Sequence, residues 1–195
     1  MTHAGAAGTL LCAPALASVS SAFAGNPVVL EARTGTAALL EAPGKPTAIW
    51  GYGGGVPGPV LRVKQGDEIW LRLKNSLTQP TTIHWHGIRI DNAMDGVAGL
   101  TQQPVPPGET FDYKFKVPDA GTFWYHPHNR SWEQMARGLY GALIVEEPEA
   151  PDVDQDIVAI ADDWRLDKDG AIHEKSFDSL FDRSHAGRLG IRQLC

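Results

Sequence analysis

Residues 81–87 read Thr-Thr-Ile-His-Trp-His-Gly, and residues 121–128 read Gly-Thr-Phe-Trp-Tyr-His-Pro-His. Each stretch carries a His-x-His pair among β-branched and aromatic residues, which favour strands. On a strand, residues i and i+2 point to the same face, so each pair offers two imidazoles to one surface. If the two strands are neighbours, four candidate metal ligands converge: His84, His86, His126 and His128. Neutral imidazole suits zinc, copper, iron and nickel.

The spacing and the cysteines separate the possible kinds of metal site. A metallo-β-lactamase-type site needs Asp and His at the second and third positions after its His-x-His, where this sequence has Ile88 and Arg89. A cupin needs Glu four residues on, where Ile90 stands. A closed structural zinc site normally uses cysteine, and a blue-copper centre needs a cysteine thiolate. The cysteines are Cys12 and Cys195, far from both motifs, so neither kind of site is expected.

Around the two motifs, short β-prone runs alternate with turn signals. The expected strands cover residues 28–33, 36–41, 48–52, 60–64, 68–74, 81–90, 110–117, 122–126, 139–146 and 156–164. Strict alternation over 68–74 and 110–117 predicts one buried and one exposed face for each of these strands. One helix is expected at 131–137, with Ser131 as its N-cap. Many short strands between turns predict an all-β antiparallel sandwich or barrel.

The first 24 residues differ from the rest, because they contain no Lys, Arg, Asp or Glu and end Ala-Phe-Ala. We expect residues 1–24 to be a secretory signal peptide, which predicts a periplasmic or secreted protein. A disordered tail is the alternative, since no basic residue precedes the apolar run. That run is too short and too rich in small residues to span a bilayer.

Length and charge limit the organisation and the partners. The 195 residues, 43% hydrophobic and 21% charged, fit one soluble domain and the start of another. We expect a first domain at 25–148, followed at 149–195 by a linker and the incomplete start of a second domain. The net charge of −6 has no basic block, which argues against nucleic acid or an anionic membrane as partner.

The motifs and their surroundings resemble the first two copper motifs of the multicopper oxidases, the group of laccases, bilirubin oxidases and bacterial periplasmic copper oxidases. The resemblance covers about residues 28–148. It is carried by the following stretches: Gly58-Pro59, Gly66-Asp67, His84-Trp85-His86-Gly87, Asp95-Gly96-Val97, Thr101-Gln102, Pro106-Pro107-Gly108-Glu109, Gly121 to His128, and Gly138 to Ala142.

This resemblance implies an N-terminal plastocyanin-like domain with the cupredoxin Greek-key sandwich or barrel. His84 would then be a ligand of a type 2 copper, and His86, His126 and His128 would bind the type 3 pair. Together these residues would supply half of the trinuclear copper cluster that reduces dioxygen to water while a reducing substrate is oxidised. Trp85, between the ligands, would point away from the metals, either into the core or against the residues that surround the ligands.

The sequence also departs from the family. Two further histidine-rich motifs of the family, one of them containing His-Cys-His, are absent. Residues 156–164 resemble the opening strand of the second domain, and the sequence loses the family pattern near Gly190, which predicts a truncated product. The chain alone is therefore expected to be inactive without C-terminal domains or another chain. The alternatives are a stand-alone copper-binding module for storage, delivery or assembly with another chain, and a non-functional truncated product.

Overall fold

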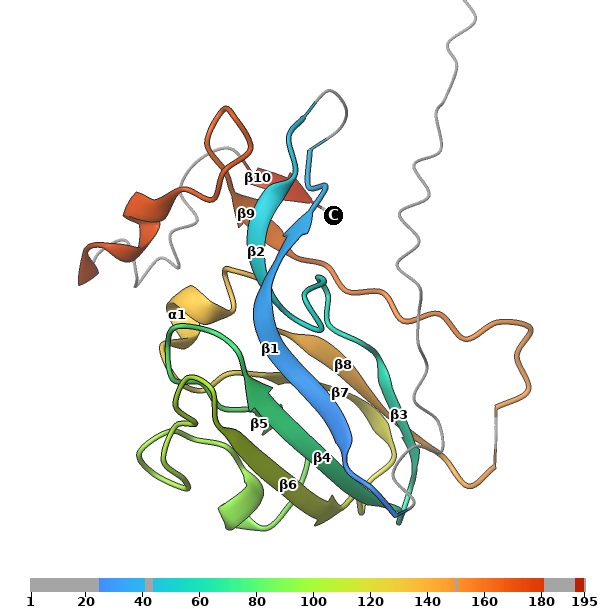
Figure 1. Cartoon of the computed structure of the whole chain (residues 1–195). Coiled ribbons are helices and arrows are strands. Elements are labelled where there is room, and N and C mark those ends of the chain that lie inside the picture. The colour runs from blue at the N-terminus through green and yellow to red at the C-terminus, as the bar shows by residue number, and fades with distance from the viewer. Residues whose placement is uncertain (1–24, 41–43, 150, 181–191, 195) are drawn as a thin grey trace, which may run out of the picture.

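The computed structural model describes residues 25–40, 44–149, 151–180 and 192–194, and most of these build two facing sheets (Figure 1). The first sheet has the order β2 (Thr47–Tyr52), β1 (Val28–Ala37), β4 (Glu68–Asn75), β6 (Thr110–Lys116). The second has the order β3 (Leu61–Lys64), β8 (Gly141–Glu146), β7 (Gly121–His126), β5 (His84–His86). The predicted all-β sandwich is confirmed. Its pairing is not purely antiparallel, because β1 runs parallel to β4 and β3 runs parallel to β8.

The alternating patterns predicted from the sequence do form the core between the two sheets. In β4, Ile69, Leu71 and Leu73 are fully buried, and the intervening residues face outward. Leu61 on β3 and Leu143 on β8 are likewise fully buried on the opposing sheet. Each such side chain contributes about 1.5–3 kcal/mol when removed from water. The sandwich therefore gives β5 and β7 a rigid base.

Two expected strand boundaries are wrong. The expected strands 28–33 and 36–41 are one strand, β1, whose pairing with β2 continues through Gly35 to Ala37. The expected strand 81–90 is reduced to β5, and Thr81 forms only an isolated bridge with Val105. The strand ends at His86 because Gly87 takes a positive φ of 88° directly after it. A glycine adopts this conformation without steric cost and ends the strand there.

The expected strand 156–164 is also mostly wrong. Only β9 (Asp163–Arg165) is a strand, and it pairs with β10 (Arg192–Leu194). Residues 156–162 are held by side chains instead: Arg62 binds Asp156 at 2.8 Å, and the Tyr140 hydroxyl donates to Asp162 at 2.6 Å. The expected strand therefore forms only at its end, because residues 156–162 are not paired with a neighbouring strand.

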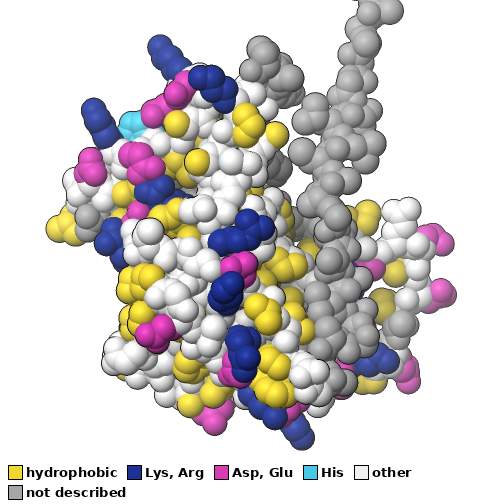
Figure 2. Space-filling view, in the orientation of Figure 1, with side chains coloured by type: hydrophobic (Ala, Val, Ile, Leu, Met, Phe, Trp, Pro, Cys, Tyr) yellow, Lys and Arg dark blue, Asp and Glu magenta, His cyan; other side chains and the backbone are white. Residues whose placement is uncertain are grey.

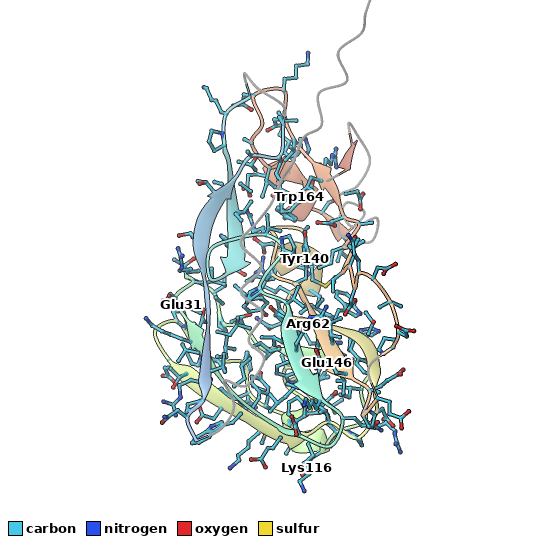
Figure 3. The ribbon with its side chains drawn as sticks, turned by 90° about the vertical axis from the view of Figure 1, so that its right-hand side faces the viewer. Glu31, Arg62, Lys116, Tyr140, Glu146 and Trp164 are labelled. Atoms are coloured by element: carbon cyan, nitrogen blue, oxygen red, sulfur yellow. The ribbon has the colours of Figure 1, made fainter. Side chains whose placement is uncertain are left out.

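Residues between 164 and 177 pack on the first sheet through a second apolar cluster. Figure 3 labels Trp164 in this cluster, above Tyr140 in the view. Trp164, Leu166, Ile172 and Phe177 are buried here together with Leu39 and Ile49. The cluster therefore joins residues of the expected second domain to the end of the first sheet.

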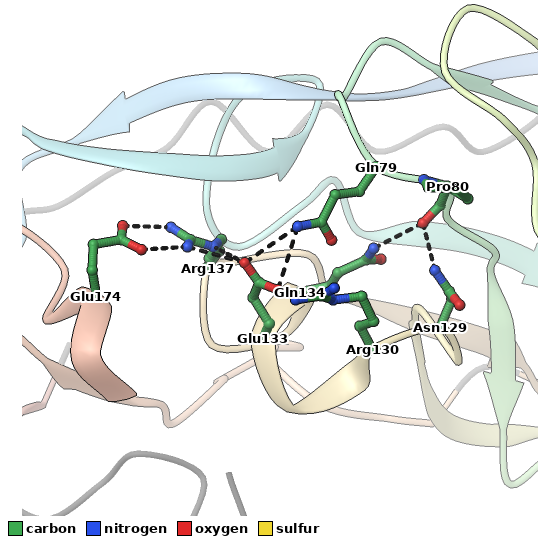
Figure 4. Close-up of polar contacts among 8 residues, drawn as sticks. All are labelled: Gln79, Pro80, Asn129, Arg130, Glu133, Gln134, Arg137 and Glu174. Carbon is green, nitrogen blue, oxygen red and sulfur yellow. Dashed lines mark hydrogen bonds and ion pairs between the residues drawn. The ribbon is translucent and has the colours of Figure 1, made fainter. Parts of the chain in front are cut away.

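The expected helix 131–137 is shorter than predicted and is capped differently. The helix α1 spans Ser131–Gln134, and its N-cap is Arg130, which has a left-handed φ of 49°. The Ser131 hydroxyl donates instead to the Pro127 carbonyl at 3.0 Å. Glu133, only 4% exposed, accepts from Arg130 and from Arg137, which also binds Glu174 (Figure 4). This network fixes α1 directly after the second histidine motif.

Charged side chains of both signs are interspersed on the face shown in Figure 2. Several form pairs across the first sheet, including Lys74 with Glu31 at 2.9 Å and Arg72 with Asp112 at 2.6 Å. Within the described ranges, no helix is long and apolar enough to cross a membrane.

Candidate metal centre

The register of β5 and β7 brings the two histidine motifs together. The two strands are antiparallel, with His84 opposite His126 and His86 opposite Trp124. Trp85 lies opposite Tyr125, and both side chains are fully buried in the core. Because side chains alternate across a strand, the histidines lie on the outer face of the sheet. The sequence prediction that Trp85 points away from the ligands is confirmed.

All four imidazoles that the sequence singled out lie close together. The ring centroid of His84 is 5.5 Å from His86, 5.3 Å from His126 and 5.1 Å from His128. One ring nitrogen from each of His84, His86 and His126 lies within 4.8 Å of the other two. His128 lies beyond the end of β7 and completes the group through its ring contact with His84. The cluster is buried at His126 and open to solvent at His86 and His128.

Backbone carbonyls decide which ring nitrogens carry hydrogen. His84 Nδ1 lies 2.7 Å from the Asp95 carbonyl oxygen, and His126 Nδ1 lies 2.9 Å from the Pro127 carbonyl oxygen. A carbonyl only accepts, so both Nδ1 atoms donate, and in the neutral form of each ring the lone pair is on Nε2. This is the arrangement in which the second nitrogen of a ligating histidine is oriented by an outer partner.

The interior of the cluster favours neutral imidazole. Burial lowers the pKa of His126 from 6.5 to about 4, although its hydrogen bond to the Pro127 carbonyl opposes the shift. The neighbouring imidazoles lower the pKa further. His126 is therefore uncharged at neutral pH and keeps the lone pair that a metal ion requires.

This pKa predicts a pH-dependent stability of the metal-free chain. The unfolded chain binds a proton at His126 below about pH 6.5, whereas the folded chain binds it only near pH 4, so stability is full above pH 6.5 and falls between these values. Between pH 6.5 and 5 the loss from this group is about 1.5 kcal/mol. Urea unfolding of the chain and of His126→Gln at both pH values measures it. The variant should lose less stability over this interval, and an equal loss would contradict the prediction.

Two residues at the site were missed as functional candidates. The Asp95 carboxylate lies 3.3 Å from His84 Nδ1, beside the carbonyl of the same residue. Trp124 stacks on His126 with ring centroids 4.1 Å apart and also contacts His86. Asp95 follows the first motif in a loop, so only the folded chain reveals its proximity. Trp124 could have been found, since it lies two residues before His126 and shares its face.

The other histidines lie apart from the cluster or outside the described residues. His173 precedes the 3-10 helix η2 (Glu174–Phe177), and its Nδ1 lies 3.0 Å from the Ser176 hydroxyl oxygen. The remaining two, His3 and His185, fall outside the described residues, as do the expected signal peptide and the stretch around Gly190. The structure thus brings the four predicted ligands together, and His173 lies away from them.

Comparisons with known proteins show which proteins this chain is similar to. A family model described as multicopper oxidase matches residues 34–150. Copper resistance protein A of Escherichia coli is 49% identical over 113 residues, which are 57% of this chain and 18% of that protein. Multicopper oxidase MmcO of Mycobacterium tuberculosis is 38% identical over 175 residues, which are 82% of this chain and 34% of that protein.

Solved structures with similar folds include further proteins of this kind. The crystal structure of Lac15 from a marine microbial metagenome has a TM-score of 0.75 and 48% sequence identity, and the match covers 87% of this chain and 42% of that one. A multi-copper oxidase from Pseudomonas Thermotolerans has a TM-score of 0.71 and 46% identity, over 80% of this chain and 36% of that one. The chain spans only 18% and 34% of the lengths of the two curated relatives.

Proposed function

The chain belongs to the multicopper oxidase family, and from that premise we propose that its outer histidine face supplies part of a copper cluster for the reduction of dioxygen to water. The observation that carries the proposal is the β5–β7 register, which sets His84 opposite His126 and gathers four imidazoles on one surface. Dioxygen and a reducing substrate are the reactants of the whole enzyme under this proposal.

The donor set fits copper. Imidazole is a common copper ligand, and in the neutral rings of His84 and His126 the carbonyl partner of Nδ1 places the hydrogen there and leaves the lone pair on Nε2. In the proposed assignment His84 holds a type 2 copper, and His86, His126 and His128 contribute to the type 3 pair. When bound, copper supplies one-electron redox chemistry. The residues of the chain orient the ligands and, through the Asp95 carboxylate, favour positive charge beside His84.

We propose that the remaining ligands come from further domains or from another chain. His86 and His128 are both exposed, so the cluster is open to solvent on one side. The described residues contain no cysteine, so this part of the chain holds no blue-copper centre. Electrons from a reducing substrate must therefore arrive from outside the described residues.

The organisation and location are part of the same proposal. Residues 25–148 form the plastocyanin-like cupredoxin domain, and residues 149–195 form a linker and the start of a second cupredoxin domain. The family match ending at residue 150 supports that boundary. A periplasmic or secreted location is supported by the uncharged, Ala-rich composition of residues 1–24.

An oxidase assay tests the proposal. The chain is loaded with copper and supplied with a phenolic substrate in air, while dioxygen consumption is followed with an electrode. We expect copper to bind to the histidines without turnover, because the described part of the chain has only part of the ligand set. Sustained dioxygen consumption that depends on His126 would contradict the partial-cluster proposal, and a chain that binds no copper would contradict the copper site itself.

A further inference from the structure

The side chain of Thr82 connects the two histidine motifs directly. Thr82 lies two residues before His84 and is fully buried. Its hydroxyl oxygen accepts a hydrogen bond of 3.0 Å from the backbone N–H of His128. Thr82, just before the first histidine motif, thus holds the backbone of His128 in the second motif.

A second set of hydrogen bonds joins the same two segments nearby. The Thr81 hydroxyl donates to the fully buried Gln134 side chain at 2.8 Å, and the Gln134 amide donates to the Pro80 carbonyl at 2.9 Å. The Asn129 amide donates to the same carbonyl at 2.6 Å (Figure 4). The segment before β5 and the chain after β7 are therefore joined at His128 and again, further along the chain, at Asn129 and Gln134.

His128 needs such a partner because the strand ladder does not reach it. The pairing of β5 with β7 ends at His126, opposite His84. Pro127 follows and has no N–H to donate. The first backbone donor beyond the ladder is the N–H of His128, and its acceptor is Thr82. The β5–β7 ladder fixes three of the imidazoles, whereas the backbone at the fourth, His128, is held by this bond and by an isolated parallel bridge to Val97.

We propose that Thr82 is a positioning residue for His128, holding this imidazole at the distance from His84 that the metal centre requires. The inference rests on the proposed copper function of the cluster. It predicts that removal of the hydroxyl weakens copper binding through His128 alone, and that any residue retaining the hydroxyl restores it. A general contribution of Thr82 to folding would weaken binding whether or not His128 is present.

The test compares Thr82→Val, which keeps the shape and removes the hydroxyl, with Thr82→Ser, which keeps the hydroxyl. Both are made in the unsubstituted chain and in His128→Ala. Copper(II) affinity is measured by competition with a chelator. Thr82→Val should lose about tenfold in affinity, as outer partners of ligating histidines do, and Thr82→Ser should stay close to the unsubstituted chain. In the His128→Ala background, adding Thr82→Val should lower the copper affinity little further. A double-mutant cycle quantifies this difference.

A measurement without metal tests the bond itself. In the metal-free chain, hydrogen exchange at the His128 amide, followed by NMR, should accelerate about tenfold or more in Thr82→Val and not in Thr82→Ser. Unchanged exchange in Thr82→Val would overturn the inference, and so would equal losses of affinity with and without His128. If the unsubstituted chain shows no histidine-dependent copper binding, the proposed function fails and the inference fails with it. If the unsubstituted chain binds copper through its histidines and Thr82→Val binds it with the same affinity, the inference about Thr82 is overturned but the proposed function stands.

Discussion

His126→Ala is expected to lower the copper affinity of the chain by more than about a hundredfold, which is the upper end of the loss caused by changing only an outer partner of a ligand. We expect this large loss because His126 lies at the centre of the histidine cluster. Its ring contacts three other imidazoles of the cluster, and its Nε2 lies 3.3 Å from Nδ1 of His86. Isothermal titration with copper(II), together with metal analysis after gel filtration, measures the affinity and the stoichiometry.

His173→Ala is the matched control for this variant. His173 is a histidine in the described part of the chain that lies away from the cluster and whose imidazole contacts Ser176. Its removal should leave copper affinity and stoichiometry unchanged. Thermal unfolding of both variants separates loss of a ligand from loss of the fold, because His126 is buried and its removal also leaves a cavity. Unchanged copper binding in a folded His126→Ala would refute the assignment.

The four candidate ligands could be selected from the sequence because their selection depends on a local rule. Alternation along a strand puts His84 and His86 on one face and Trp85 on the other, and this holds wherever the strand lies. Their convergence with His126 depends on which strand pairs with β5, a long-range contact that the sequence pattern leaves open. The family resemblance, rather than the spacing, made that pairing the expected one.

The partners of the ligands could not be predicted, because loops and caps place them. His84 is oriented by a backbone carbonyl of Asp95, and any residue type offers a carbonyl. Ser131 has the side chain of a good N-cap, but the left-handed conformation of Arg130 starts the helix one residue earlier. Such features follow from the path of the whole chain, which local propensity does not specify.

Gly96→Ala is expected to destabilise the fold by about 3 kcal/mol or more and to weaken copper binding. Gly96 has a positive φ of 77°, and a Cβ there would meet the Ile83 carbonyl at less than van der Waals distance and lie 2.9 Å from His84 N. These are backbone atoms at the start of β5, so the clash is relieved only by moving the strand or the loop. Either movement separates the Asp95 carbonyl from His84 Nδ1, which it orients.

Gly99→Ala isolates the steric part of this effect. Gly99 lies in the same loop with a nearly equal φ of 76°, but a Cβ there would meet nothing within 4 Å. This variant should lose only the cost of a left-handed alanine, about 1 kcal/mol, and should bind copper like the unsubstituted chain. Urea unfolding and copper titration of the two variants side by side measure the difference. Equal destabilisation by both would mean that the close approach of Gly96 to the His84 backbone contributes nothing to the site.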